Sequence, residues 1–475
     1  MVNRQYSPSS PQLAWLSGIY CCAVVCLLVY QSQQSIRSAV YIPQPTGILD
    51  NWQQLLTIQS GGDTSHWFGS LLALPFWFGF QWLNVLIMAW GFLLAFEQHH
   101  RSLESTAVLR RSLLSLLWPF WSVIWLGLPV LWTLEIARLI EPFPSWGLIA
   151  SGLFPLTFDF SGRSLDPVIH VGWFLPTLVS LTLLFPLIWQ LIKQWGVANL
   201  LLVSLLLTIS YRLVATYLWN AYPTYVMPVT AIVGNGQPFA LFFARLAPFV
   251  LGIIAGRAYA RGKGPCHWSW GKSLVIGSVF YSLGFICQFY RWGWAIDEIL
   301  VSGGIGLVSL VGFRLLCRVA LLRSACLWGG AYAYTGFLLQ GLVLDHFGER
   351  LYAIASNQWL WILSIALVTL LLSLLVSYLS PYLQRLIRAI GRDLHYVLTQ
   401  APPHQQRVWR PQVADRVTYQ DQTGWIVLKV EPLLDERQFL LCKVSNGERS
   451  LWVNEDDLEL EIGSFPKAVF RSNSA

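Results

Sequence analysis

The sequence predicts an all-α polytopic membrane bundle of about ten transmembrane helices, followed by a small all-β domain at the C-terminus. The composition predicts the bundle, because 55% of the 475 residues are hydrophobic and only 12% are charged, whereas soluble domains have roughly a quarter charged residues. The apolar residues also gather in runs long enough to cross a bilayer. After Arg392 the pattern changes to alternating apolar and polar residues, which predicts strands.

Ten apolar runs are each long enough to span a bilayer as a helix. No processed signal-peptide pattern precedes the first run, so we expect it to be retained as the first helix. The predicted spans lie near residues 13–31, 72–95, 112–134, 173–192, 197–218, 238–258, 272–290, 298–317, 325–344 and 357–382.

Lysine and arginine differ in density between successive loops. The loops of one set hold Arg101, Arg110, Arg111, Lys193, Arg257, Arg261, Lys263, Arg314, Arg318, Arg323, Arg385, Arg388 and Arg392. The alternate loops hold mainly Arg37, Arg138, Arg163, Arg291 and Arg350. Because cytoplasmic loops carry the excess of basic residues, we expect the first set to be cytoplasmic. An even number of spans then places both termini in the cytoplasm.

The remaining composition excludes several classes of function. The net charge of +7 is explained by membrane topology, so we expect the lipid bilayer and not nucleic acid as a partner. None of the eight cysteines forms a CxxC pair with histidine partners, and no metal-spaced cluster is present, so we expect no metal. The sequence also has no glycine-rich phosphate loop and no GxSxG nucleophile elbow.

The predicted domains are a membrane domain over residues 1–392, a linker over 393–411 and a cytoplasmic domain over 412–475. Five short runs rich in Val, Ile, Leu and Trp alternate in the last domain, and Asn446-Gly447 is a hairpin-turn signal. This pattern predicts a small SH3-like barrel. Such a barrel could bind a protein partner, but nothing in it indicates chemistry.

Residues 170–188 are the stretch in which we expect function. His170, with Asp166 four residues before it, lies at the entrance to an apolar helix that begins with Trp173. The helix contains a few small polar residues and the kink-forming Pro186, and such a helix could line a cavity. The small polar residues are Thr177, Ser180 and Thr182.

Two arginines lie within or near predicted spans, Arg212 and Arg245. An arginine at bilayer depth is costly unless it faces a wet cavity or a counter-charge. The alternatives are snorkelling of the side chain to the headgroups and a role in a cavity, and the sequence does not separate them.

Four stretches resemble the acyltransferase 3 family, whose members are integral membrane acyltransferases. They are LAWLSGIYCCAVVCLLVYQ (13–31), VLIMAWGFLLA (85–95), GWFLPTLVSLTLLFPLI (172–188) and GAYAYTGFLLQ (330–340). The resemblance covers about residues 10–390 and implies transfer of an acyl group, such as acetyl, from acyl-CoA (acetyl-CoA) to a hydroxyl of an envelope glycan or lipid. It also implies O-acetylation at the cell envelope and a place in a bacterial inner membrane.

The sequence departs from the family at its polar positions. The family's first helix usually has an arginine and, eleven positions later, a histidine thought to be essential, and its other motifs carry a serine, a glutamate and a late histidine. The residues at these positions here are Ser17, Leu28, Trp90, Leu178 or Val179, and Gln340. The chain therefore resembles a divergent member whose packing residues are kept and whose titratable residues are replaced.

The resemblance and the residues together give a set of candidate sites. Acyl transfer needs a base for the acceptor hydroxyl, and His170 is the candidate, oriented by Asp166. The substrate-binding candidates are Trp173, Arg212, Arg245 and Tyr334. The candidates for the phosphates of coenzyme A are Arg257, Arg261 and Lys263, which topology alone would also explain.

Two functions therefore stay open. The first is a membrane acyltransferase. The second is a catalytically inactive protein of the same shape that acts as a transporter, a lipid-binding protein or a scaffold for the C-terminal domain. The absence of the expected polar residues favours the second, and the order and spacing of the four stretches favours the first.

Overall fold

The computed structural model describes residues 13–35, 43–60, 78–101, 105–137, 174–223, 237–355, 358–399, 413, 416–419, 422–432, 440–454 and 458–460. The chain forms two compact units, Met1–Leu383 and Gln384–Ala475, which we describe separately. The predicted domain boundaries near residues 392 and 412 stay a prediction.

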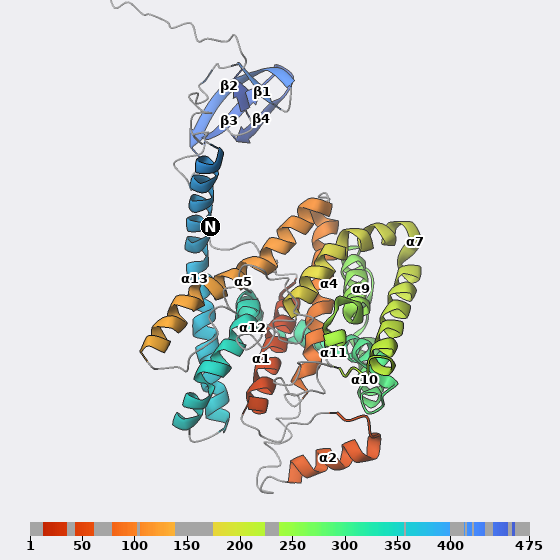
Figure 1. Ribbon diagram of the computed structural model, residues 1–475. Helices are drawn as coiled ribbons and strands as arrows, with labels where there is room; N and C mark the ends of the chain where they lie inside the picture. Colours follow the sequence, from red (N-terminus) through yellow and green to blue (C-terminus); the bar gives the residue numbers. More distant parts are fainter. Residues whose placement is uncertain are drawn as a thin grey trace, which may run out of the picture. The chain divides into compact units, whose positions relative to one another are not determined.

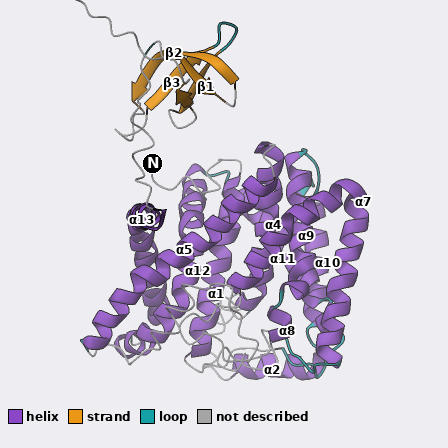
Figure 2. Ribbon diagram, turned by 45° about the horizontal axis from the view of Figure 1, so that its top comes forward, coloured by secondary structure: helices purple, strands orange, loops and turns teal. Residues whose placement is uncertain are grey.

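The first unit consists of helices, and its long helices lie side by side (Figure 2). The α-helices are α1 Ala14–Ser35, α2 Ile48–Ser60, α4 Trp82–Arg101, α5 Ser105–Ile136, α7 Phe174–Tyr217, α8 Gln237–Ala240, α9 Phe242–Ala260, α10 Trp270–Cys287, α11 Asp297–Leu316, α12 Ala320–Ile354 and α13 Gln358–Thr399 (Figure 1). The last helix, α13, begins in the first unit and ends in the second. Short 3-10 turns are η3 Gly79–Gln81, η5 Pro265–His267 and η6 Gly293–Ala295.

In the described part of the chain, 8 helical segments are long and apolar enough to cross a bilayer. The outward faces agree with this: Leu363, Leu367, Leu371 and Leu375 follow one another at helical spacing on α13 and are 50–64% exposed. Such a row of exposed leucines fits contact with lipid. The protein is thus a multi-pass membrane protein. The predicted count of ten spans is not confirmed, since the predicted span 325–344 lies in α12, which is not among the 8.

Helix α7 contains two of the predicted spans. Its 44 residues would extend about 66 Å if straight, roughly twice the bilayer core. Gly196, with φ 80° and ψ 168°, interrupts the helical backbone, a conformation that glycine adopts without steric cost. The two halves of α7 run in different directions on either side of it (Figure 1). The interruption falls between the predicted spans 173–192 and 197–218.

Helices α4 and α9 pack at backbone distance. A Cβ atom on Gly252 or Gly256 of α9 would collide with the carbonyl oxygen of Met88 or Phe92 on α4. Small residues spaced by four allow two membrane helices to approach in this way. The close approach fixes α9 against α4, and both helices contribute to the site described below. Helix α10 also packs extensively against α11, and α1 against α12.

The second unit contains a small antiparallel sheet in the order β4-β3-β2-β1-β5. Its strands are β1 Arg416–Tyr419, β2 Gln422–Pro432, β3 Leu440–Ser445, β4 Ser450–Asn454 and β5 Leu458–Leu460. Gly447 has φ 92° in the predicted hairpin turn, and the Asn446 side chain accepts hydrogen bonds from the backbone N–H groups of Glu448 and Arg449. No pairing joins β4 to β5 in the described residues, so the sheet is open there and a closed SH3-like barrel is not confirmed.

The α4–α9 contact generates a prediction. We expect Gly252→Ala to destabilise the protein by about 1–3 kcal/mol, because the added methyl group meets a backbone carbonyl that cannot move aside. The control is Gly312→Ala on α11, where nothing lies within 4 Å of the added atom and where alanine favours the helix by about 1 kcal/mol. Thermal unfolding of the two purified variants in detergent measures the difference. Equal unfolding temperatures would contradict the close approach of α4 and α9.

Candidate functional site: a buried charge network

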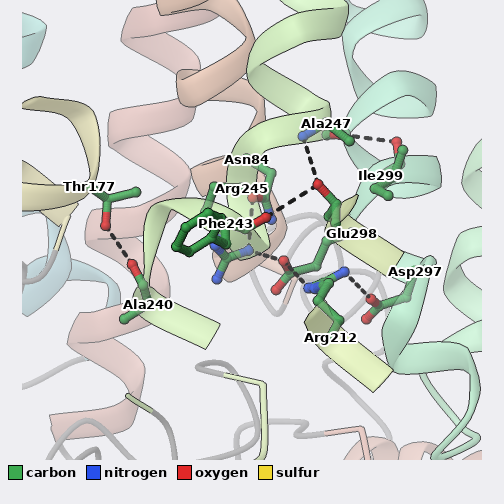
Figure 3. A network of polar contacts seen from close by, with 12 residues as sticks. Asn84, Thr177, Arg212, Ala240, Phe243, Arg245, Ala247, Asp297, Glu298 and Ile299 are labelled. Atoms are coloured by element: carbon green, nitrogen blue, oxygen red, sulfur yellow. Dashed lines mark hydrogen bonds and ion pairs between the residues drawn. The ribbon is translucent and has the colours of Figure 1, made fainter. Parts of the chain in front are cut away.

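Four helices of the membrane unit direct charged or amide side chains toward one another in the interior. We call Asn84, Arg212, Arg245, Asp297 and Glu298 the charge network (Figure 3). Asn84 belongs to α4, Arg212 to α7, Arg245 to α9 and the two acids to α11. The side chains therefore converge from segments that lie up to 214 residues apart in the sequence.

Each charged group of the network contacts a partner of opposite charge. Arg212 Nη1 lies 3.2 Å from Asp297 Oδ1, and Arg212 Nη2 forms an ion pair with Glu298 Oε2. Arg245 Nη1 forms an ion pair with the same Glu298 oxygen and donates a hydrogen bond of 2.8 Å to Asn84 Oδ1. Glu298 is therefore shared by two guanidinium groups that come from different helices.

The network is removed from the surface. Arg212, Arg245 and Asp297 are each 0% exposed, and Glu298 is 4% exposed. The ring of Phe239 lies 5.1 Å from the guanidinium carbon of Arg212 and covers one of its faces. Isolated charges at such a position would be very costly, but two positive and two negative groups balance. Neither arginine snorkels to the headgroups, which was one of the two alternatives that the sequence left open.

The positions of the two acids on their helix favour the network. Asp297 and Glu298 are the first two residues of α11, where the helix dipole stabilises negative charge. Arg212 lies five residues before the end of α7, outside its last turn, and Arg245 lies in the first turn of α9, so the helix dipole favours neither cation. The local sequence thus reduces the cost of burying the two carboxylates, whereas the two guanidinium groups depend on their ion pairs.

Hydroxyl groups tie the same helices together. The Thr208 hydroxyl on α7 accepts a hydrogen bond of 3.1 Å from the Ala247 N–H and donates one of 3.2 Å to the Phe243 carbonyl, both on α9. Thr177 donates to the carbonyl of Ala240 on α8. These bonds hold the first half of α7 against α8 and the second half, which contains Arg212, against the start of α9, which contains Arg245.

The small polar residues of the 174–188 stretch have structural partners in this arrangement. Thr182 accepts a hydrogen bond of 2.9 Å from Trp90 Nε1 and donates one of 2.6 Å to the Leu178 carbonyl. Thr177 and Thr182 are both buried. Trp90 stands at the position where the family usually has a serine, and here it ties α4 to the first half of α7.

The other predicted site residues lie elsewhere. Tyr334 donates a hydrogen bond of 3.1 Å to the Leu116 carbonyl, so it joins α12 to α5. His170, Asp166 and Trp173 lie outside the described residues.

The predicted phosphate-binding group lies at and after the C-terminal end of α9. Arg257 lies with its guanidinium carbon 5.5 Å from the centre of the Trp189 ring, and Arg261 and Lys263 are exposed. Arg245 and Arg257 share α9 and are twelve residues apart, which is about 18 Å along a helix. The two predicted groups of basic residues are therefore well separated.

The sequence analysis missed Asn84, Asp297 and Glu298. The acids could have been found, because an acidic pair that opens an apolar span is as costly in a membrane as the two arginines. Two carboxylates and two guanidinium groups in apolar segments each need a counter-charge, so the sequence could have predicted that they pair with one another. No comparable signal distinguishes Asn84 from other polar residues near a span.

The charge network lies inside a region that matches a known family. A family model described as an acyltransferase domain matches residues 54–378, which is more than half of the 475 residues and includes all five residues of the network. No curated protein and no solved structure matches the chain. The match and its length show that this multi-pass membrane protein belongs to the acyltransferase 3 family.

Proposed function

We propose that this protein transfers an acyl group, acetyl in the simplest case, from acyl-CoA to a hydroxyl of an envelope glycan or lipid. The observation that carries the proposal is the family match over residues 54–378, which supports a membrane acyltransferase in general. The donor, the acceptor and a place in a bacterial inner membrane with both termini in the cytoplasm are the parts that we propose. Because Leu28 stands where the family's first helix usually has a histidine, the base has to come from another residue.

In the proposed reaction a base removes the proton of the acceptor hydroxyl while its oxygen attacks the thioester carbonyl. Collapse of the tetrahedral oxyanion breaks the carbon–sulfur bond, and the proton passes to the departing thiolate of coenzyme A. We assign the base to His170, oriented by Asp166, with Trp173 and Tyr334 beside the acceptor. For the first three this assignment rests on the sequence alone.

We assign Arg212 and Arg245 to positioning of the acceptor. One oxygen of Glu298 already contacts two guanidinium groups, so we do not assign Glu298 as the base. Because Arg212 and Arg245 are fully buried and paired, they would position the acceptor through the helices that they join and not by direct contact. Arg257, Arg261 and Lys263 are then assigned to the phosphates of the donor, well away from the acceptor.

A second function is favoured by a specific observation. The residues at the family's polar positions are buried packing residues here: Ser17 and Gln340 are 0% exposed, Leu28 is 4% and Trp90 is 8% exposed. Helix α12 packs so closely on Ser17 that a Cβ on Gly330 would collide with it. A side chain as long as arginine at position 17 would therefore find this space already occupied. A protein that has lost transferase chemistry and acts as a transporter, lipid-binding protein or scaffold is therefore the alternative.

The main prediction concerns acyl esters in the cell envelope. We expect a strain without the gene to lack an ester-linked acyl group on an envelope glycan or lipid, and wild-type protein to restore it. His170→Ala should fail to restore it, because the acceptor hydroxyl then has no base. Mass spectrometry of fractionated glycans and lipids, before and after mild alkaline treatment, measures the ester.

The matched control is His99→Ala, which removes an exposed histidine on α4 and should restore the ester fully. Restoration by His170→Ala would keep the acyltransferase and reject His170 as the base. The absence of any acyl difference between the strains would reject the proposed reaction and favour the inactive alternative.

A second prediction concerns the charge network. We expect Arg212→Gln to destabilise the protein by about 3–5 kcal/mol, because a carboxylate then loses its buried partner. The double variant Arg212→Gln/Asp297→Asn should recover much of this loss, since the charges balance again. Lys193→Gln, an exposed substitution on the same helix, should change little. Thermal unfolding in detergent gives the free-energy differences.

The same variants separate a structural role from a role in binding the acceptor. If Arg212 positions the acceptor, the double variant regains stability but not acyl transfer. Recovery of both would assign the network to folding alone. An unfolding temperature of Arg212→Gln equal to that of Lys193→Gln would contradict the ion pairs themselves.

A further inference from the structure

A second group of arginines surrounds an open pocket away from the charge network. The pocket has a volume of about 220 Å³ and is lined by Trp15, Trp270, Arg314, Cys317, Arg318 and Arg323. Trp15 and Trp270 lie in the first turns of α1 and α10, Arg314 in the last turn of α11, and Arg323 in the first turn of α12, while Cys317 and Arg318 follow the end of α11. Helix N-termini carry partial positive charge and the C-terminus of α11 partial negative charge, so the positive charge of the pocket comes mainly from its arginines.

Two arginines of the pocket are held in place by contacts with neighbouring residues. Arg314 Nη1 donates a hydrogen bond of 2.6 Å to the Cys266 carbonyl, which fixes its guanidinium group. The guanidinium carbon of Arg318 lies 4.4 Å from the centre of the Trp270 ring. A guanidinium group that stacks on an indole keeps its edge available for planar hydrogen bonding.

The positive charge of the pocket has no protein counter-charge in the described residues. No described carboxylate forms an ion pair with Arg314, Arg318 or Arg323, and the segments 257–272 and 313–326 contain no aspartate or glutamate. Burial raises the pKa of the Cys317 thiol to about 11, with Cys326 beside it contributing, so this thiol is uncharged near neutral pH. The excess of basic residues in cytoplasmic loops explains the number of cations but not their gathering around one cavity.

We propose that this pocket binds a phosphate group of a small ligand through the forks of Arg318 and Arg323. Guanidinium groups bind phosphate oxygens with two parallel hydrogen bonds, which suits a pocket with several arginines. Clefts that enclose a drug-sized ligand have volumes of roughly 300–1,000 Å³, so the pocket takes a phosphate-bearing headgroup or part of a larger molecule. The phosphate belongs either to a soluble ligand or to an anionic lipid, and the test below distinguishes them.

Binding to the purified full-length protein in an uncharged detergent tests the proposal. Titration calorimetry uses three probes: coenzyme A, inorganic pyrophosphate and dihexanoylphosphatidylglycerol. We expect the double variant Arg318→Gln/Arg323→Gln to bind at least one of them about tenfold more weakly or worse, because each lost charge-assisted pair contributes on this scale. The matched control is Arg350→Gln, an exposed arginine later on α12, which should bind like wild type.

The probes identify the source of the phosphate. Weaker binding of coenzyme A and pyrophosphate supports a soluble ligand, and weaker binding of the lipid alone supports a headgroup. The proposal is overturned if wild type binds none of the probes, or if the double variant and Arg350→Gln bind them equally.

A variant that preserves charge guards against misfolding. If the glutamine variant does not elute as a single species, Arg318→Lys/Arg323→Lys replaces it, because lysine keeps the charge and loses the fork. Wild-type affinity in the lysine variant would overturn binding through the arginine forks. Since binding is measured on purified protein, a failure to detect acyl transfer in cells rejects the proposed function without changing this result.

Discussion

Two arginine side chains lie inside the membrane unit, and one glutamate on α11 binds both of them. Arg212 and Arg245 belong to helices that also share the Thr208 hydroxyl. Removing Glu298 or Asp297 would leave uncompensated positive charge in an apolar interior, where the cost is several kcal/mol. The relative positions of α4, α7, α9 and α11 therefore depend on the balance of these charges, together with the close packing of α4 on α9.

The membrane unit combines these specific ion pairs with apolar contacts that are less specific. Exposed leucines on α13 face outward, and a lipid environment does not distinguish one row of leucines from another. Glycines that admit a neighbouring backbone, as Gly252 does, and buried ion pairs provide the orientation that apolar packing lacks. The same division is visible in the sequence, where a largely apolar background carries a small number of polar residues.

Local patterns were sufficient to predict much of the fold. The interruption at Gly196 falls between two predicted spans, and the hairpin at Asn446-Gly447 follows the turn signal. The pairing of Arg212 with Asp297 joins residues 85 apart, and that of Arg245 with Glu298 joins residues 53 apart. Neither pairing leaves a periodic signal, so a single sequence indicates only that each arginine needs a partner. The count of spans was uncertain for a different reason, since α12 mixes apolar residues with glycine, tyrosine and charged residues.

The order of the charged residues along the chain has a consequence for biosynthesis. Arg212 and Arg245 enter the translocation machinery before Asp297 and Glu298 have been synthesised. Until α11 is inserted, the nascent chain holds two cations at bilayer depth without the carboxylates that later neutralise them. A ribosome-bound intermediate that ends before residue 297 therefore lacks the ion pairs that join α7 and α9 through Glu298. Until α11 arrives, these two helices are held together by the Thr208 hydrogen bonds and by apolar contacts.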